Sequence, residues 1–344
     1  MASSPHAADA TAAPLQGATR PPFFIVGSDR SGTTMLRLML DRGADGPAIP
    51  PETMFITDFR GVLEAGSGLE EHDAAKEYTR RVWAHPRVQL WGIPGEPTPP
   101  PVGLSHREAF RWAVEQPFLA YMRHEGKTWW ADKTPPNIDH VELLASIFEG
   151  AKFVELVRDG RDVTLSMIGM PWGDNNVWTC GVRWAHCIRE GERQRAVHPD
   201  SMLLVRYEDL VTEPREQLQR VSEFLEMAYS DDMLAVEKTD TSKLQHQDWF
   251  SNLWKGINTS AMDKWRTKMS EHDQRVFLAA AGDELRLHGY DAAGLEPAHV
   301  GAWERRRYAI TNFAKRLVNF VKLRIVTERG KELRFVIARR LKRR

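Results

Sequence analysis

Residues 23–36 read Phe23-Phe24-Ile25-Val26-Gly27-Ser28-Asp29-Arg30-Ser31-Gly32-Thr33-Thr34-Met35-Leu36, and this stretch decides the fold. An apolar run enters a turn that contains two glycines and leaves it as an amphipathic helix. The glycines permit a tight turn with inward-facing backbone N–H groups, and the positive end of the helix favours an anion there. The stretch therefore predicts a phosphate-binding loop, with donors from Arg30, Ser31, Gly32, Thr33 and Thr34.

The spacing of the two glycines matches the Gly-x-x-x-x-Gly frame of the Walker A motif. That motif continues with Lys and then Ser or Thr, whereas this chain continues with Thr33-Thr34 and carries its basic residue, Arg30, inside the loop. A nucleoside triphosphate with Mg²⁺ is therefore disfavoured as the ligand, and no metal site is expected. A kinase or NTPase of the P-loop class stays as an alternative function.

Three further apolar runs end in polar turns that lead into helical segments. They cover residues 128–136, with Asn137 as the expected helix cap; 152–157, followed by Arg158 and a helix from about Val163; and 201–207, followed by a helix from about Glu213-Pro214. Alternating strands and helices predict an α/β fold with a parallel central sheet flanked by helices on both faces. Because ligands bind such sheets beyond the carboxyl ends of the strands, we expect Arg158 and the Gly27 loop to meet on one ligand.

The 344 residues divide into a leader, one catalytic domain and a tail. Residues 1–21 are rich in Ala, Ser and Pro and lack the apolar segment of a signal peptide, so we expect a disordered leader. Residues 22–300 form the domain, with a helical, Trp-rich insertion at about 55–127. The insertion's tryptophans either line an acceptor pocket or, as is commoner at helical spacing, belong to the core: Trp83, Trp91 and Trp112.

The overall charge and the cysteines give little information about partners. Lys plus Arg and Asp plus Glu are both 47, and we expect no nucleic-acid partner. No apolar run reaches the ~20 residues that a membrane-spanning helix requires. The spacing of Cys180 and Cys187 suits neither a zinc site nor a disulfide framework, and it indicates reduced thiols in the cytoplasm.

The tail, residues 301–344, holds an excess of positive charge. Between Trp303 and Arg344 there are fifteen Lys/Arg and three Glu, in two segments with apolar residues at helical spacing. These residues are Ile310, Phe313, Leu317, Phe320 and Val321 in the first segment and Leu333, Val336, Ile337 and Leu341 in the second. Such segments lie on an anionic membrane, or they pack on the domain or on a second subunit. The tail also supports a second alternative function, a non-catalytic nucleotide-binding scaffold at a membrane. The oligomeric state is not set by the sequence.

The strand ends together resemble those of sulfotransferases that use 3′-phosphoadenosine-5′-phosphosulfate (PAPS), over about residues 22–290. The most similar branch is the bacterial type, which is also similar to protein-tyrosine sulfotransferases. Gly27–Leu36 resembles the family's 5′-phosphosulfate loop, with Asp29 where a proline is usual. Residues 156–166 resemble the 3′-phosphate segment, with Arg158 and Ser166 at its phosphate-contacting positions, and residues 204–210 resemble the next strand end. The resemblance implies a P-loop-like sulfotransferase fold, PAPS as co-substrate and no metal.

The resemblance also implies catalytic roles outside the loop. Lys133 matches a lysine that reaches the oxygen between sulfur and the 5′-phosphate, but Lys133-Thr134-Pro135 replaces the Lys-Thr-His of cytosolic members, so the base must lie elsewhere. Glu52-Thr53 matches a Glu-Thr pair of the tyrosine-sulfating branch. We expect Glu52 to be the base, with a pKa raised by burial. Lys255-Gly256 resembles the element that closes over the 3′-phosphate.

Several of these residues have a structural alternative. Glu52 is otherwise a helix-capping or surface glutamate, Lys133 a solvated lysine, and Arg158 half of a structural ion pair. Asp29 either orients Arg30 or weakens its hold on the anion. His140 and His246 are given no role.

The predicted reaction is transfer of a sulfuryl group from PAPS to an acceptor hydroxyl or amine. Glu52, Lys133 and Arg30 are the expected catalytic residues. The acceptor belongs to a glycan, a lipid, a peptide or a small molecule, and nothing in residues 55–130 selects among these classes.

Overall fold

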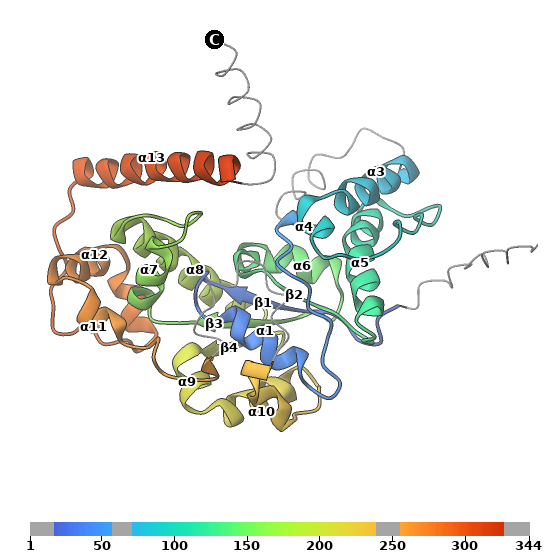
Figure 1. Cartoon of the computed structure of the whole chain (residues 1–344), viewed down its shortest axis with the longest axis horizontal. Helices are drawn as coiled ribbons and strands as arrows, with labels where there is room; N and C mark the ends of the chain where they lie inside the picture. The colour runs from blue at the N-terminus through green and yellow to red at the C-terminus, as the bar shows by residue number, and fades with distance from the viewer. Residues whose placement is uncertain (1–16, 57–70, 239–254, 327–344) are drawn as a thin grey trace, which may run out of the picture.

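The computed structural model describes residues 17–56, 71–238 and 255–326. Its centre is a sheet of four parallel strands in the order β2-β1-β3-β4 (Figure 1). The strands are β1 (Phe23–Gly27), β2 (Ala131–Lys133), β3 (Lys152–Val157) and β4 (Met202–Arg206). Ile25 pairs with Lys133 on one side and with Val154 on the other, so the strands end at one edge of the sheet. The predicted parallel α/β sheet is confirmed.

Strand β1 is buried on both of its faces. Phe23 and Ile25 belong to a core shared with α1 (Thr33–Asp41), α9 (Tyr207–Thr212) and α10 (Pro214–Phe224). Phe24 and Val26 belong to a second core shared with α5 (His106–His124) and α6 (Val141–Ile147). Figure 1 shows α9 and α10 below the sheet, and α6 and α8 (Val177–Val197) above it. Because successive strand residues point to opposite faces, a continuous apolar run is what this central position requires.

The insertion packs beside the sheet as α3 (Glu71–Trp83), α4 (Pro86–Gln89) and α5. Trp91 is 6% exposed, and its ring centroid lies 5.3 Å from that of Phe118. Trp91 is therefore a core residue, whereas Trp83 and Trp112 are half-buried.

Two predicted helix starts are wrong. Asn137 does not cap a helix: it lies inside a 3-10 helix, η1 (Pro135–His140), which leads into α6, and its side-chain amide donates to Asp132 instead. Helix α7 (Gly160–Ile168) begins before Val163, because the Asp159 side chain accepts a hydrogen bond from the Arg161 N–H and caps the helix there. The strand ends themselves lie where they were predicted.

The described residues of the last third of the chain are mainly helical, as expected. They form two 3-10 helices, η2 (Asp231–Leu234) and η3 (Val236–Lys238), and three α-helices, α11 (Lys264–Lys268), α12 (Glu271–Leu287) and α13 (Ala302–Val326). Helix α13 contains the first basic segment, and the second, from Leu333 to Leu341, lies outside the described residues. Within the described ranges, no helix is both apolar and long enough to cross a bilayer.

Candidate functional site

The turn after β1 has a backbone that only small residues permit. Gly27 has a φ of 130°, and a Cβ there would lie 2.5 Å from the Leu156 carbonyl oxygen. Gly32 has a φ of 95°, and its Cβ would lie 2.4 Å from the Tyr207 ring. Gly32 is also the N-cap of α1, whose first turn has free N–H groups and no acidic residue. The geometry is that of an anion-binding loop.

Two further donors at this loop lack hydrogen-bond partners among the described residues. Ser31 is buried, and its Oγ is unsatisfied. The Nε of the buried Arg158 is unsatisfied as well. Because unpaired buried polar groups are costly, these two atoms fit a bound anion that would accept their hydrogen bonds.

Arg30 and Arg158 lie against each other, although they are 128 residues apart. Arg158 Nη1 donates to the Arg30 carbonyl oxygen at 3.0 Å, and Arg30 Nε donates to Ser166 Oγ at 3.0 Å. Burial, together with the charge of Arg158, lowers the pKa of Arg30. Two neighbouring guanidinium groups, of which Arg158 is buried and Arg30 half-buried, repel each other, and an anion between them relieves that repulsion.

Arg158 is held by neutral partners. Its Nη2 donates to the Ala261 carbonyl oxygen at 2.6 Å, and its guanidinium carbon lies 4.7 Å from the centroid of the Tyr207 ring. No ion pair of Arg158 is found in the ranges that the structure describes, so its charge stays available. The alternative of a structural ion pair applies instead to Arg161, whose Nη2 lies 2.7 Å from Asp159.

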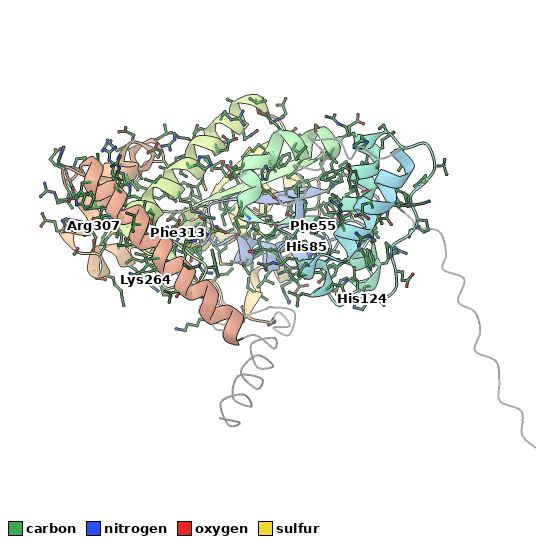
Figure 2. All side chains as sticks on the ribbon, turned by 90° about the horizontal axis from the view of Figure 1, so that it is seen from above. Phe55, His85, His124, Lys264, Arg307 and Phe313 are labelled. Atoms are coloured by element: carbon green, nitrogen blue, oxygen red, sulfur yellow. The ribbon has the colours of Figure 1, made fainter. Side chains whose placement is uncertain are left out.

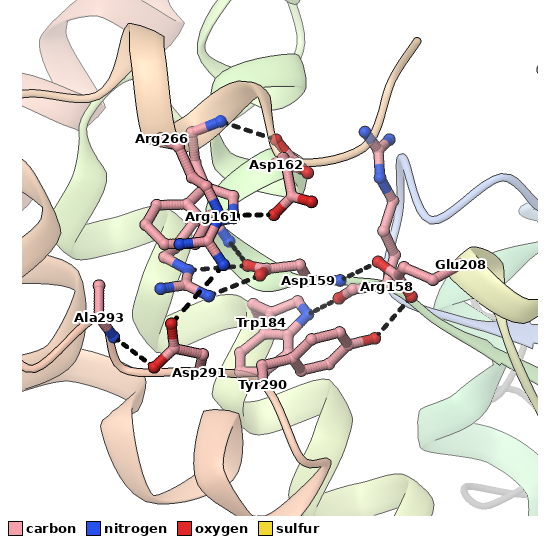
Figure 3. A network of polar contacts seen from close by, with 12 residues as sticks. Arg158, Asp159, Arg161, Asp162, Trp184, Glu208, Arg266, Tyr290, Asp291 and Ala293 are labelled. Carbon is pink, nitrogen blue, oxygen red and sulfur yellow. Dashed lines mark hydrogen bonds and ion pairs between the residues drawn. The ribbon is translucent and has the colours of Figure 1, made fainter. Parts of the chain in front are cut away.

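A buried network around this turn fixes the backbone of Arg158 (Figure 3). The Trp184 indole donates to the Arg158 carbonyl oxygen at 3.0 Å. Glu208 accepts from the Asp159 N–H at 3.0 Å and from the Tyr290 hydroxyl at 2.9 Å. Trp184 is on α8 and Glu208 on α9, so helices from both faces of the sheet hold the turn.

Glu52 and Lys133 form an ion pair at the neighbouring strand end. The Lys133 Nζ lies 2.5 Å from Glu52 Oε1, and their side chains are 4% and 34% exposed respectively. Burial tends to raise the pKa of Glu52, but the charge and hydrogen bond of Lys133, together with the charges of Arg87 and Arg37, outweigh burial, and the pKa is lowered. The expectation of a raised pKa is therefore wrong, because the sequence did not reveal this partner. Lys133 is not a solvated lysine.

A fully buried polar network lies next to this pair, and sequence reasoning missed it. Thr134 Oγ1 accepts from the Thr53 N–H at 3.0 Å and donates to Asp132 Oδ1 at 3.0 Å. Asn137 donates to the other Asp132 oxygen at 2.8 Å. Burial raises the pKa of Asp132 to about 7. The network ties the Glu52-Thr53 segment to the end of β2, and the only signal in the sequence was that a Thr follows both Glu52 and Lys133.

Asp29 pairs with Arg183 of α8, at 2.7 Å between Oδ2 and Nη2. Burial raises the pKa of Asp29, opposed by Arg183. The pair opens onto a cavity of 280 Å³ on the side of the loop toward η1 and α8. Its lining residues are Gly27, Asp29, Pro136, Asp139, Arg183, His186 and Cys187. The loop thus has a polar cavity beside it.

Lys255 and Gly256 lie on a segment that reaches Arg158. Lys255 is exposed and Gly256 has a φ of 72°, and a few residues later the Ala261 carbonyl accepts from Arg158. No contact of Lys255 with the Arg30 and Arg158 cluster is seen among the described residues. His140 is buried on η1, and His246 lies outside the described part of the chain.

Comparisons with known proteins show the family of the chain. A family model described as the sulfotransferase family matches residues 21–231. A protein-tyrosine sulfotransferase of Danio rerio is 28% identical over 286 residues, which cover 79% of this chain and 72% of that protein. Protein-tyrosine sulfotransferase A of Caenorhabditis elegans is 27% identical over 284 residues, covering 79% and 68%.

A solved structure shows the same fold. The sulfotransferase domain from the Synechococcus PCC 7002 olefin synthase superposes with a TM-score of 0.51 at 24% identity, covering 81% of this chain and 98% of that domain. The chain therefore belongs to the sulfotransferase family, and its activity is the transfer of a sulfuryl group to an acceptor.

Proposed function

We propose that the sulfuryl donor is PAPS and that the acceptor group is a hydroxyl. One observation carries the proposal. The guanidinium groups of Arg30 and Arg158 lie together at the glycine loop, and the carboxylate of Glu52 is ion-paired with Lys133 at the adjacent strand end. A donor with phosphate on both its 5′ and 3′ sides needs two anion sites, and a hydroxyl acceptor needs a base. A Walker-type NTPase instead binds its phosphates with a lysine directly after the second glycine of the loop and with Mg²⁺, and here Thr33 stands at the position of that lysine.

The donor-binding residues belong to three elements. Arg30, Ser31, Gly32, Thr33 and Thr34 bind the 5′-phosphosulfate through side chains and backbone N–H groups. Arg158 and Ser166 bind the 3′-phosphate, for which a guanidinium fork and a hydroxyl are suited. The link from Arg30 to Ser166 supports a single continuous donor site. Lys255 and Gly256, which precede Ala261 on the same segment, close over the 3′-phosphate.

Glu52 and Lys133 act together during transfer. Glu52 accepts the proton of the attacking hydroxyl as the acceptor oxygen forms its bond to sulfur. The bond from sulfur to the 5′-phosphate oxygen breaks, and the electron pair leaves with the phosphate, where Lys133 neutralises its charge. When Lys133 turns from Glu52 toward that oxygen, burial of Glu52 is opposed only by the charges of Arg87 and Arg37, so its pKa rises and it becomes a stronger base.

The acceptor is expected to enter through the cavity beside Asp29. Because the two relatives above are protein-tyrosine sulfotransferases, a tyrosine-containing peptide comes first among the acceptors to be tested.

We place the enzyme in the cytoplasm, and support comes from Cys180 and Cys187, which are both buried free thiols.

The donor is tested directly with PAPS labelled in its sulfuryl group. We expect label to pass to a hydroxyl acceptor in a screen of phenolic peptides, sugars and alcohols, and to do so in the presence of EDTA. The control is ATP with Mg²⁺ and labelled γ-phosphate, from which no transfer is expected. Transfer from ATP that EDTA abolishes would refute the proposal and favour a kinase.

The network around Asp132 gives a prediction about positioning. Thr134→Val removes a hydrogen bond from the Thr53 N–H and one to Asp132, both buried. We expect the free energy of unfolding in urea to fall by about 1–3 kcal/mol. We also expect kcat to fall roughly 10–100-fold, because the backbone at Thr53 loses its hydrogen bond to the end of β2 and Glu52 is then positioned by its ion pair alone, while KM for PAPS changes little.

The matched control for Thr134 is Thr212→Val. Thr212 is exposed, and its hydroxyl donates to the Glu208 carbonyl oxygen within a helix. Its replacement should change stability by less than about 0.5 kcal/mol. A Thr134→Val enzyme with normal kcat would show that the network stabilises the fold without positioning Glu52.

A further inference from the structure

Helix α13 attaches to the domain through polar groups. Asn312 is 9% exposed; its side-chain amide donates to Asp174 at 2.7 Å, and its oxygen accepts from the Asn175 N–H at 2.8 Å. One turn earlier, the Tyr308 carbonyl oxygen accepts from Asn176 at 3.0 Å. An amphipathic helix on a globular domain ordinarily buries its apolar side. Here the bound side carries these polar groups together with the Tyr308 ring, which stacks on Trp178.

The apolar side of α13 consequently faces away from the domain. Trp303, Ile310 and Leu317 follow one another at intervals of two helical turns, and Phe313 lies on the adjoining part of the same side. Their exposed fractions are 73%, 64%, 53% and 70% respectively. In Figure 2, α13 crosses the near side of the molecule with Phe313 and Arg307 labelled along it. We call these four residues the α13 stripe.

A groove runs along one edge of the α13 stripe. It has a volume of 500 Å³ and lies between α13 and the start of α8. The lining combines apolar and polar groups: Ala309, Phe313 and Leu317 with Thr179, Asn312 and Arg316. Such a lining can admit a ligand molecule that is apolar along its length and anionic at one end.

The positive charges around the α13 stripe decide which kinds of partner can bind to it. Arg306 and Arg307 are exposed beside it, and fifteen Lys/Arg against three Glu lie between Trp303 and Arg344. A second copy packed stripe to stripe would bring two strongly positive surfaces together, and so would the chain's own basic residues beyond 326. Repulsion of this kind opposes both contacts.

We propose that the α13 stripe is a docking surface for an anionic lipid bilayer, with its four large side chains in the interface and its arginines among the lipid headgroups. Exposed Trp, Phe, Leu and Ile beside Lys and Arg are the side chains that interfacial helices use. Each Lys or Arg near an anionic surface strengthens binding roughly fivefold. Because Asn312 is hydrogen-bonded to the domain, the opposite side of α13, which carries the stripe, is the side that faces the bilayer.

The test is cosedimentation of the full-length protein with vesicles, without donor or acceptor, so its outcome does not depend on the sulfuryl-transfer chemistry. Vesicles of phosphatidylcholine alone are compared with vesicles that also contain ~30 mol% phosphatidylserine. We expect binding to the anionic vesicles only, and we expect it to weaken as salt is raised. The variant Trp303→Ser/Phe313→Ser/Leu317→Ser should reduce that binding by about tenfold or more.

A matched control removes exposed apolar side chains elsewhere. Val197→Ser/Leu287→Ser changes residues that are 54% and 63% exposed and lie outside α13, and its vesicle binding should equal that of the wild type. Circular dichroism and the melting temperature verify that both variants fold. Equal binding by the α13 triple variant and the wild type would overturn the proposal. So would a concentration-dependent dimer in analytical ultracentrifugation, without vesicle binding, that the triple variant abolishes.

Discussion

The Glu52→Gln enzyme is expected to lose roughly 10²–10⁴-fold in kcat, since the amide keeps the shape of the side chain but cannot accept the acceptor proton. The proposed donor site lies on other residues, so the dissociation constant for the desulfated nucleotide should change less than about threefold. Steady-state transfer from labelled PAPS gives kcat, and titration calorimetry with the desulfated nucleotide gives the binding constant. Intact nucleotide binding also verifies that the variant is folded.

The chain offers a matched control for Glu52 in a second Glu–Lys pair. Lys152 Nζ lies 2.6 Å from Glu226 Oε1, nearly the same separation as in the Glu52 pair, but Glu226 is 79% exposed on the surface. Glu226→Gln should keep wild-type kcat. If Glu52→Gln also turns over at a near-normal rate, then Glu52 is not the base.

Lys133→Met should lower kcat by about 10²–10³-fold, because the leaving phosphate loses the cation that meets its charge. The pH profile carries a second and more specific expectation. In the wild type Lys133 helps to lower the pKa of Glu52, so kcat/KM should fall on the acid side only below the ordinary range of a glutamate. In the variant burial is opposed only by more distant arginines, the pKa of Glu52 rises, and this acid limb moves to higher pH.

Lys152→Met is the corresponding control, since it removes the lysine of the surface pair. It should keep both the rate and the acid limb. A Lys133→Met enzyme that loses activity but keeps the wild-type acid limb would show that the limb does not report Glu52. Full activity in that variant would remove Lys133 from the leaving-group role.

The sequence was sufficient to predict the site residues that lie at the carboxyl ends of neighbouring strands. Strand β1 and its loop could be predicted because an apolar run, two glycines and a helix are local features. Arg158 could be placed at the loop because β3 pairs with β1 in parallel, so their carboxyl ends coincide. Lys133, at the end of β2, was identified through the resemblance to the sulfotransferase family instead.

The sequence was insufficient where a side chain finds its partner across the fold. Glu52 lies on no strand and meets Lys133 over a separation of 81 residues, so its pKa was predicted in the wrong direction. The partner of Asp29 is 154 residues away on α8, a helix whose rotation no local pattern specifies. Helix α13 was predicted as amphipathic, but which side binds the domain depended on Asn312 and Asp174.

The loop after β1 is clamped on several sides. Gly32 lies under the Tyr207 ring, the Arg30 side chain is bound to Ser166, and the Arg30 carbonyl is bound to Arg158. Its conformational entropy has therefore been lost during folding, at the expense of the stability of the domain. An anion that binds there does not have to order the loop, and more of its interaction energy appears as affinity.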